Sequence, residues 1–308
     1  MLRKIFPSIL AILFFFPLVL FGQDETSQPS IHVQVNLVSL DVEVLDRNDL
    51  AVRGLTKENF VVEEDGEPRD ITNFSVATDL PVSLIVALDT SALSTKQLII
   101  CKNFIRSLTH AMSGSDQFCL YSFDNRRPFL EQDFTSNYLD IWSALDNVGV
   151  PSKNGGGVLR EMFDPGPPTG LAVDLALRKM RDAGKGKEVL LLISNRFRNL
   201  GPATVEHIQQ SGCTFLTLAF SHKSSKIIAF GDAINTSQMM RESGGRQFSA
   251  ETEDIEEVGR QIVSSLKNYY SIGYLTEIRS GDHKPRKIRI HIPGKKFKIH
   301  FRRTYIPL

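Results

Sequence analysis

The residues best placed to do chemistry stand at the end of one strand. The run from Pro81 to Leu88 shows no polar alternation, and Asp89, Thr90 and Ser91 follow it directly. Such a run, bounded by a proline and by small polar residues, predicts a strand buried on both faces. In open α/β sheets, ligands bind outside the carboxyl ends of such strands. One carboxylate with neighbouring hydroxyls also suits Mg²⁺, which prefers oxygen ligands.

Further oxygen donors stand in two later segments. Thr169 lies in the stretch Pro167-Pro168-Thr169-Gly170, and Asn195 follows a second apolar run, Val189 to Ile193. This pattern resembles the von Willebrand factor type A domain. The shared features are a buried strand ending in Asp-x-Ser, a following helix, a later threonine and a second strand ending in Ser-Asn. More narrowly, the layout is similar to the secreted type A-related proteins of acidobacterial soil bacteria, in which β segments flank the domain. The resemblance covers nearly the whole chain after its first residues.

The resemblance implies a metal-ion-dependent adhesion site formed by Asp89, Ser91, Thr169 and Asn195. Two positions of the family's pattern are altered, because Leu93 stands where a second serine is expected and Asn195 replaces an aspartate. Ser94 comes next, but it is expected to cap the following helix. Two lost ligands should weaken metal binding on the order of 10² to 10⁴-fold. We therefore expect a degenerate site that holds Mg²⁺ or another divalent cation weakly.

A purely structural interpretation of the same residues stays open. In that interpretation Asp89 and Thr90 end a strand, and Ser91 bonds neighbouring backbone amides.

Strands and helices alternate through the middle of the chain. Ser94 and Gln97 form a capping box, after which apolar residues recur at spacings of three and four as far as Met112. Further strands are predicted at Phe118 to Phe123, Val189 to Ile193 and Phe215 to Phe220, and helices at Tyr138 to Leu145, Leu171 to Met180, Val205 to Gln210, Ile234 to Arg241 and Ile255 to Tyr269. This alternation predicts an α/β fold with a doubly wound, mainly parallel, Rossmann-like sheet over residues 81–268.

β segments are expected on both sides of this region. Residues 23–80 contain an alternating run from Ile31 to Val44, with a phase change at Leu37 that predicts a bulge, and a tight turn at Asp65-Gly66. In residues 269–308, apolar and basic residues alternate around Pro293-Gly294, which predicts a β-hairpin. Because sheets of this size are marginal alone, we expect the two segments to pack together as a small β-sandwich.

The first 22 residues are expected to be a secretory signal peptide. Arg3 and Lys4 precede an apolar segment, and Gly22 supplies a small residue at the expected cleavage point. An uncleaved membrane anchor is the alternative, but prolines interrupt the run, which is short for a membrane span. We therefore expect a secreted or periplasmic protein with no stable membrane span after cleavage. The three cysteines are expected to be buried apolar side chains and not a disulfide framework.

Composition and motifs disfavour several classes of function. The net charge of +1 and the charged content of 23% are ordinary for a globular protein. A basic stripe is formed by Lys287, Arg289, Lys296, Lys298, Arg302 and Arg303. No aromatic residues are interleaved on it to stack bases, which disfavours nucleic acid, and such lysines more often keep a sheet soluble. The sequence contains no Gly-x-Ser-x-Gly and no His-Glu-x-x-His motif, and the glycines at 155–157 lack the context of a phosphate-binding loop.

We expect an exported type A-like binding or adhesion module that is not an enzyme. It would recognise a protein or another surface macromolecule through the loops Asp89 to Ser94, Gly155 to Thr169 and Ser194 to Asn199, since rigid scaffolds display recognition residues on loops. The alternative is a metal-assisted hydrolase in which Asp89 and a weakly held ion activate water. Enzymes of that kind usually collect several carboxylates, and this motif supplies one. The fold class names neither the partner nor the oligomeric state.

Overall fold

The computed structural model of the chain describes residues 33–77, 80–91, 93–112, 114–149, 168–183, 186–195, 200–220, 239–250, 255–279 and 284–307. The expected signal peptide lies outside these residues. So do most of the expected loop from Gly155 to Thr169, the chain from 196 to 199, and most of the helix expected at Ile234 to Arg241. No helix in the described stretches has both the length and the apolar content that a membrane span needs.

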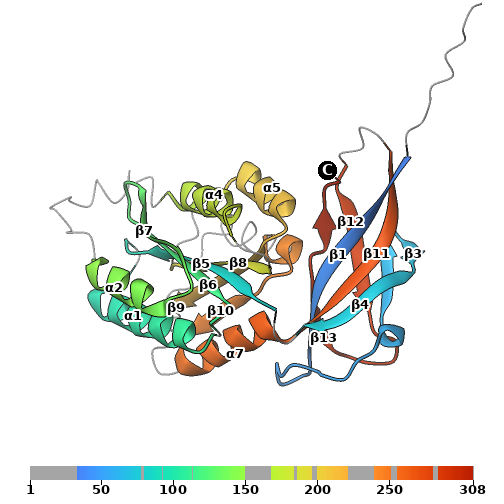
Figure 1. Cartoon of the computed structure of the whole chain (residues 1–308), viewed down its shortest axis with the longest axis horizontal. Helices are drawn as coiled ribbons and strands as arrows, with labels where there is room; N and C mark the ends of the chain where they lie inside the picture. The colour runs from blue at the N-terminus through green and yellow to red at the C-terminus, as the bar shows by residue number, and fades with distance from the viewer. Residues whose placement is uncertain are drawn as a thin grey trace, which may run out of the picture. The chain divides into compact units, whose positions relative to one another are not determined.

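A six-stranded sheet forms the centre of residues 82–267 (Figure 1). Its strand order is β10-β9-β8-β5-β6-β7. The strands are β5 (Val82–Asp89), β6 (Gln117–Phe123), β7 (Pro128–Thr135), β8 (Lys187–Ile193), β9 (Thr214–Phe220) and β10 (Gln247–Ala250). Neighbouring strands pair in parallel except for β7, an antiparallel edge strand. The α/β fold with a mainly parallel sheet is therefore confirmed.

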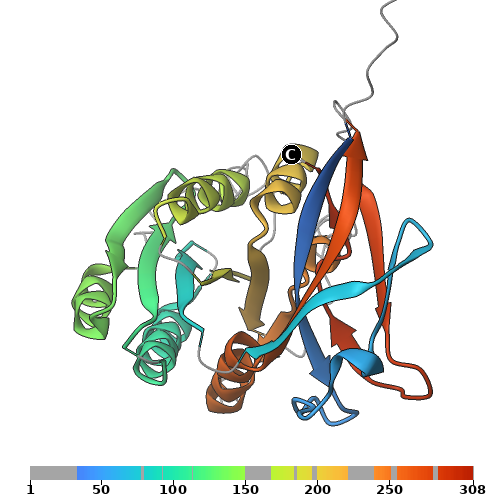
Figure 2. The same cartoon turned by 45° about the vertical axis from the view of Figure 1, so that its right-hand side comes forward.

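Helices cover both faces of this sheet (Figure 2). One apolar core joins the sheet to α1 (Thr95–His110), α2 (Tyr138–Asn147) and α7 (Ile255–Lys267), and another joins it to α4 (Thr169–Met180) and α5 (Pro202–Ser211). Strand β5 lies between the cores, with Leu84 and Val86 in the first and Ile85 and Ala87 in the second. Burial of both faces explains why the sequence of this strand shows no polar alternation.

Strands from before β5 and after α7 pair with one another in two four-stranded sheets, ordered β13-β1-β11-β4 and β14-β12-β2-β3. The strands are β1 (Val33–Leu45), β2 (Val61–Glu64), β3 (Glu67–Arg69), β4 (Ile71–Ala77), β11 (Tyr269–Arg279), β12 (Arg286–His291), β13 (Lys298–His300) and β14 (Thr304–Tyr305), and a 3-10 turn spans η1 (Lys57–Asn59). One apolar core, which includes Val42, Val62, Ile272 and Ile290, joins the two sheets. They form a small β-sandwich, and we interpret residues 82–267 as an insertion between its two halves.

The C-terminal segment is not the hairpin that its alternating pattern predicts. β12 pairs with β2 and β14 in one sheet, whereas β13 pairs with β1 in the other. Apolar residues of this segment, among them Ile288, Ile290 and Phe301, still contribute to a common core. A two-stranded ribbon would leave its apolar face exposed, whereas strands placed in facing sheets bury it.

Strand β11 corrects two further expectations. Tyr269, expected on the last helix, is the first residue of β11, because α7 ends at Lys267. The bulge expected at Leu37 does not form, since β1 pairs with β11 in continuous register from Val33 to Val42. The phase of the pattern changes because Val35 and Leu37 are apolar residues on the exposed face of β1, where they are 60% and 53% exposed. From Val38 onward the apolar residues lie on the buried face.

Two smaller features also have structural explanations. In the basic stripe, Arg289 pairs with Glu63 at 3.2 Å and Lys298 with Asp49 at 2.7 Å, so acidic residues of the N-terminal β segment compensate part of its charge.

The cysteines at 101, 119 and 213 are free and buried, as expected.

Candidate functional site

Asp89 and Ser194 meet at the carboxyl edge of the six-stranded sheet. β5 and β8 are parallel neighbours whose register places Leu88 opposite Ile193, so the residues that follow them lie side by side. The Asp89 carboxylate accepts a hydrogen bond from the Ser194 hydroxyl at 2.6 Å. Both residues are completely buried. The pairing of β5 with β8 therefore brings Asp89, the last residue of β5, next to Ser194, the first residue after β8.

Ser91 holds the other oxygen of the same carboxylate. Asp89 Oδ1 accepts hydrogen bonds from the Ser91 N–H at 3.0 Å and from the Ser91 hydroxyl at 2.6 Å. The Thr90 hydroxyl turns away and donates to the Phe123 carbonyl on β6 at 3.1 Å. Ser91 thus bonds the Asp89 side chain through both its N–H and its hydroxyl.

Thr169 and Asn195 lie at the same edge. Asn195 directly follows Ser194 and is half-buried, whereas Thr169 is the completely buried first residue of α4. α4 ends at Met180 and the chain enters β8 at Lys187, so the helix runs back over the sheet against the direction of β8. Its 12 residues span about 18 Å, close to the length of a seven-residue strand. The start of α4, and with it Thr169, therefore lies at the carboxyl edge of the sheet.

All four residues of the expected site lie at this edge of the sheet. The strands β5 and β8 that lead to it are parallel neighbours, and the antiparallel strand β7 lies at one side of the sheet. This arrangement is the one that the resemblance to the von Willebrand factor type A domain implies, and we call residues 82–267 the type A-like domain. In this type A-like domain, hydrogen bonds directly join Asp89 to Ser91 and to Ser194. Ser194 is absent from the set predicted by sequence. The signal that could have found it is its position, since it follows the second apolar run as Asp89 follows the first.

Leu93, at the position where a second serine is expected, and the neighbouring Ser94 have other structural roles. Leu93 is 4% exposed and belongs to the core beneath α1. The Ser94 hydroxyl accepts a hydrogen bond from the Gln97 N–H at 3.3 Å, and the Gln97 side-chain oxygen accepts one from the Ser94 N–H at 2.9 Å. This confirms the capping box and commits Ser94 to the helix.

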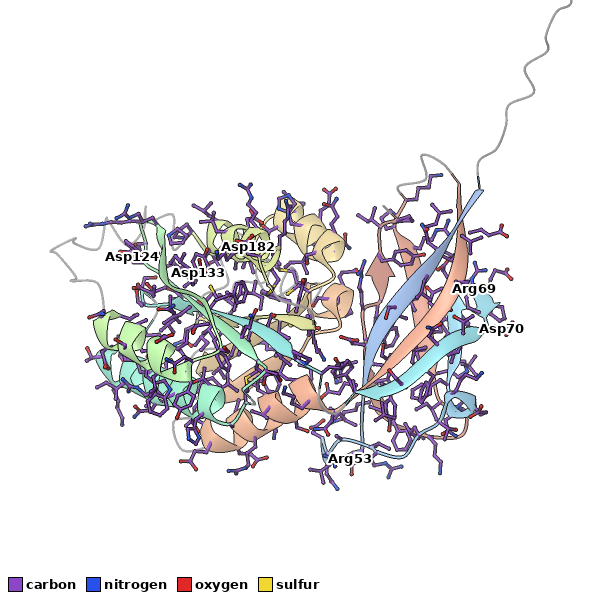
Figure 3. All side chains as sticks on the ribbon, in the orientation of Figure 1. Arg53, Arg69, Asp70, Asp124, Asp133 and Asp182 are labelled. Carbon is purple, nitrogen blue, oxygen red and sulfur yellow. The ribbon has the colours of Figure 1, made fainter. Side chains whose placement is uncertain are left out.

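The donor set of the site consists of one buried carboxylate with neutral oxygens. Asp124, labelled in Figure 3, follows β6 at the same edge, but its carboxylate closes a turn by accepting the N–H groups of Arg126 at 2.7 Å and Arg127 at 3.1 Å. Across the residues that the structure describes, no three His, Cys, Asp or Glu side chains gather to hold a metal. A cation here would depend on hydroxyl and amide oxygens beside Asp89, a set that fits weakly held Mg²⁺.

Comparison with known proteins gives similar folds and no sequence family. No family model and no curated protein matches the sequence. An aerotolerance-related membrane protein from Bacteroides fragilis is similar at 16% identity, covering 59% of this chain and 99% of that one, with a TM-score of 0.43. The vWF domain of the type V pili tip protein Mfa5 from Porphyromonas gingivalis is similar at 10% identity, over 62% and 97% of the two chains, with a TM-score of 0.42. Proximal thread matrix protein 1 from the mussel byssus is similar at 12% identity, over 62% and 49%, with a TM-score of 0.47.

Proposed function

We propose that this chain is an exported binding module that recognises a protein or another surface macromolecule at the carboxyl edge of its type A-like domain. The observation that supports this most is the Asp89 cluster, a buried carboxylate held by Ser91 and Ser194 at the rim of a rigid sheet. The chain leaves the sheet at this rim after β5, β8 and β9, and connections on such a scaffold commonly carry recognition residues.

We assign no catalytic role to the cluster. A general base must reach the proton that it removes, through a direct hydrogen bond or through one water. Asp89 is completely buried, and both of its oxygens accept hydrogen bonds from serine hydroxyls. This geometry disfavours the metal-assisted hydrolase considered as the alternative.

A divalent cation is expected to bind this edge weakly. Titration of the purified chain with Mn²⁺, followed by the loss of the free-ion EPR signal, should give a Kd on the order of 1 mM or weaker. Asp89→Asn preserves the shape of the side chain and removes its charge, so it should weaken binding at least about tenfold. Asp124→Asn is the matched control at the same edge and should leave the affinity unchanged. Micromolar binding that Asp89→Asn abolishes would show that the site is not degenerate.

Recognition at this edge can be tested by crosslinking in the native envelope. We expect the full chain to form a specific adduct with its partner. The double variant Asp89→Asn, Thr169→Val should reduce the yield of this adduct several-fold, whereas Arg289→Met, on the β-sandwich, should leave it unchanged. The same preparation tests export, because the mature chain should begin at Gln23 and be recovered from the periplasm or the medium. Equal adducts for both variants would contradict recognition at the edge. Ester or phosphate hydrolysis that is lost in Asp89→Asn would support the hydrolase instead.

A further inference from the structure

One strand of the β-sandwich has a long open edge. β1 has 13 residues, and its residues from Val33 to Val42 pair with β11 along one side (Figure 1). On its other side, β1 pairs with β13 only from Glu43 to Leu45. Among the strands that the structure describes, no further strand pairs with this second side. The backbone N–H and C=O groups of alternate residues before Glu43 therefore point along an open edge.

This edge lacks the features that usually keep the edges of sheets from pairing with other chains. Those features are charged residues, prolines, bulges and a short strand. From Val33 to Leu40 the sequence contains neither a charged residue nor a proline, and the register with β11 is continuous. A regular and uncharged edge of this length is a template for another strand.

The other strands at the edges of the described sheets do carry such features. β3, β10, β13 and β14 are short, with three, four, three and two residues. β4 lies beside a register shift between Gly273 and Tyr274 of β11. β7 lies beside register shifts in β6 and carries Glu131 and Asp133. β1 is therefore the exception among the edge strands that the structure describes.

An apolar surface adjoins the open edge. Val35 and Leu37 are exposed on the face of β1 opposite to the face that carries Val38 and Leu40 in the core. Leu275 lies opposite Leu37 on β11 and is half exposed. A strand placed beside β1 would bring the side chains of its alternate residues into contact with Val35 and Leu37.

We propose that the open edge of β1 binds an extended segment of another protein as an added strand. The partner segment is neutral and has apolar residues at alternate positions, because the edge is uncharged and apolar contacts cover Val35 and Leu37. The added strand continues the line of β13, which already pairs with the same side of β1 in antiparallel orientation. Main-chain hydrogen bonds supply the affinity of such strand addition, and the alternate side chains supply its specificity. The surface belongs to the β-sandwich and not to the carboxyl edge of the type A-like domain.

Calorimetric titration of the full chain with the peptide acetyl-Ser-Val-Thr-Val-Ser-Val-Thr-Val-amide tests the proposal. The peptide should bind with a Kd on the order of 100 μM. The same peptide with an N-methyl group on every residue keeps the side chains but donates no main-chain hydrogen bonds, so it should bind at least about tenfold more weakly.

Hydrogen exchange followed by mass spectrometry locates the bound peptide. At a peptide concentration of about ten times the Kd, exchange in residues 33–42 should slow about tenfold. Exchange in β4, at the opposite edge of the same sheet, should not change.

A charged residue beside the open edge should block the added strand. Leu37→Lys introduces a charge at an exposed position, so it should keep the fold and weaken peptide binding at least about tenfold. Val76→Lys is the matched control, because Val76 is equally exposed on β4 at the opposite edge of the sheet, and it should leave binding unchanged.

Four results would overturn the proposal. They are no binding at about ten times the expected Kd, equal affinity for the N-methylated peptide, slowed exchange outside β1 alone, and an affinity that Leu37→Lys does not change. Sedimentation velocity of the full chain adds a further test. A dimer that Leu37→Lys dissociates would mean that a second copy of this chain occupies the edge, which would also overturn the assignment to another protein.

Discussion

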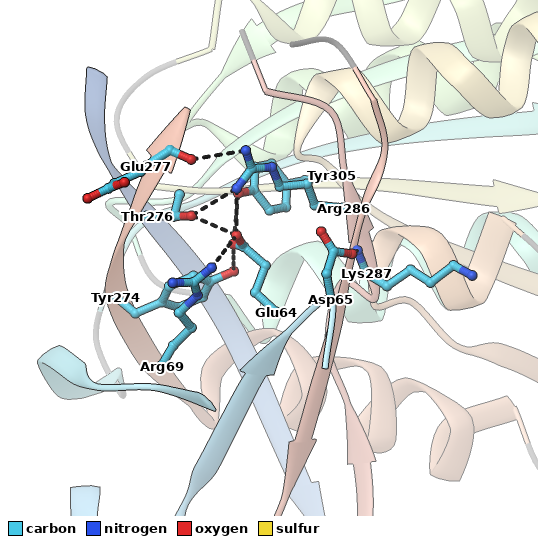
Figure 4. Close-up of polar contacts among 9 residues, drawn as sticks. All are labelled: Glu64, Asp65, Arg69, Tyr274, Thr276, Glu277, Arg286, Lys287 and Tyr305. Carbon is cyan, nitrogen blue, oxygen red and sulfur yellow. Dashed lines mark hydrogen bonds and ion pairs between the residues drawn. The ribbon is translucent and has the colours of Figure 1, made fainter. Parts of the chain in front are cut away.

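Replacing Glu64 with glutamine is expected to lower the free energy of unfolding by about 3–5 kcal/mol, the usual cost of breaking a buried ion pair. Glu64 on β2 accepts hydrogen bonds from side chains of β3, β11, β12 and β14 (Figure 4). The donors are Arg69 at 3.3 Å, Tyr274 at 2.8 Å, Thr276 at 2.6 Å, Arg286 at 2.8 Å and Tyr305 at 2.9 Å. Glutamine keeps the shape but removes the buried negative charge that faces both guanidinium groups.

The neighbouring residue provides a matched control. Glu63 lies on the same strand and pairs with Arg289 at 3.2 Å, but the Arg289 side chain is 75% exposed. Glu63→Gln should therefore change the free energy of unfolding by less than about 1 kcal/mol. Urea denaturation followed by circular dichroism measures both variants. Similar losses in the two variants would show that burial of Glu64 does not decide its contribution.

The contribution of Glu64 is expected to vanish in acid. Burial raises the pKa of Glu64, but hydrogen bonds from Thr276, Arg286 and the two tyrosines outweigh burial and hold this pKa below its ordinary value of 4.5. Since the folded-state pKa lies below the unfolded one, the stabilisation is present above about pH 4.5 and is lost as the pH falls through the folded-state pKa. The difference in urea midpoint between the wild-type chain and Glu64→Gln should accordingly shrink between pH 6 and pH 3. A constant difference over that range would contradict this assignment.

Gly245→Ala is expected to destabilise the type A-like domain by on the order of 3 kcal/mol or more, because an added methyl group has no space. A Cβ at this position would lie 1.7 Å from the carbonyl oxygen of Phe215 on β9 and 3.1 Å from the Ser243 hydroxyl. Both Phe215 and the backbone of Gly245 are fixed, the first by a hydrogen bond from its N–H to Ser243 and the second by one to Met240. The clash involves backbone atoms, which cannot move aside as a flexible side chain can.

Gly259→Ala is the control for this substitution. Gly259 lies inside α7, where an added Cβ would meet the ring of Phe104 at an ordinary contact distance of 3.4 Å. Alanine is the better helix former, so Gly259→Ala should raise the free energy of unfolding by up to about 1 kcal/mol. Thermal unfolding followed by circular dichroism gives the sign of each change. A tolerated Gly245→Ala would mean that the segment before β10 can move away from β9.

Much of the type A-like domain could be predicted because its signals are local. The apolar runs of β5, β8 and β9 record burial on both faces, and the capping box at Ser94 records the start of α1. The edge strand β7 was not predicted, because its side chains are at most half-buried and show no clear pattern. Strand β11 does alternate through Tyr270, Ile272 and Tyr274, but the helical spacing of α7 runs into its start and hides it.

The candidate site divides in the same way. Asp89, Ser91, Thr169 and Asn195 come from the resemblance to the type A domain, and each stands close to a point where a strand ends or a helix begins. That they hold a cation stays a prediction. Ser194 as a partner of Asp89 follows only from the register between β5 and β8, two strands whose contacting residues lie 105 positions apart.

The order of residues along the chain is enough to specify burial, helix caps and tight turns, since each depends on neighbours a few positions away. Folding adds the choice of partners. It places β12 and β13 in opposite sheets, where adjacency in sequence predicts a hairpin. It also brings the Tyr305 hydroxyl to Glu64 across 241 positions. Such pairings depend on how several segments that are distant in sequence pack in one core, so no local sequence pattern predicts them.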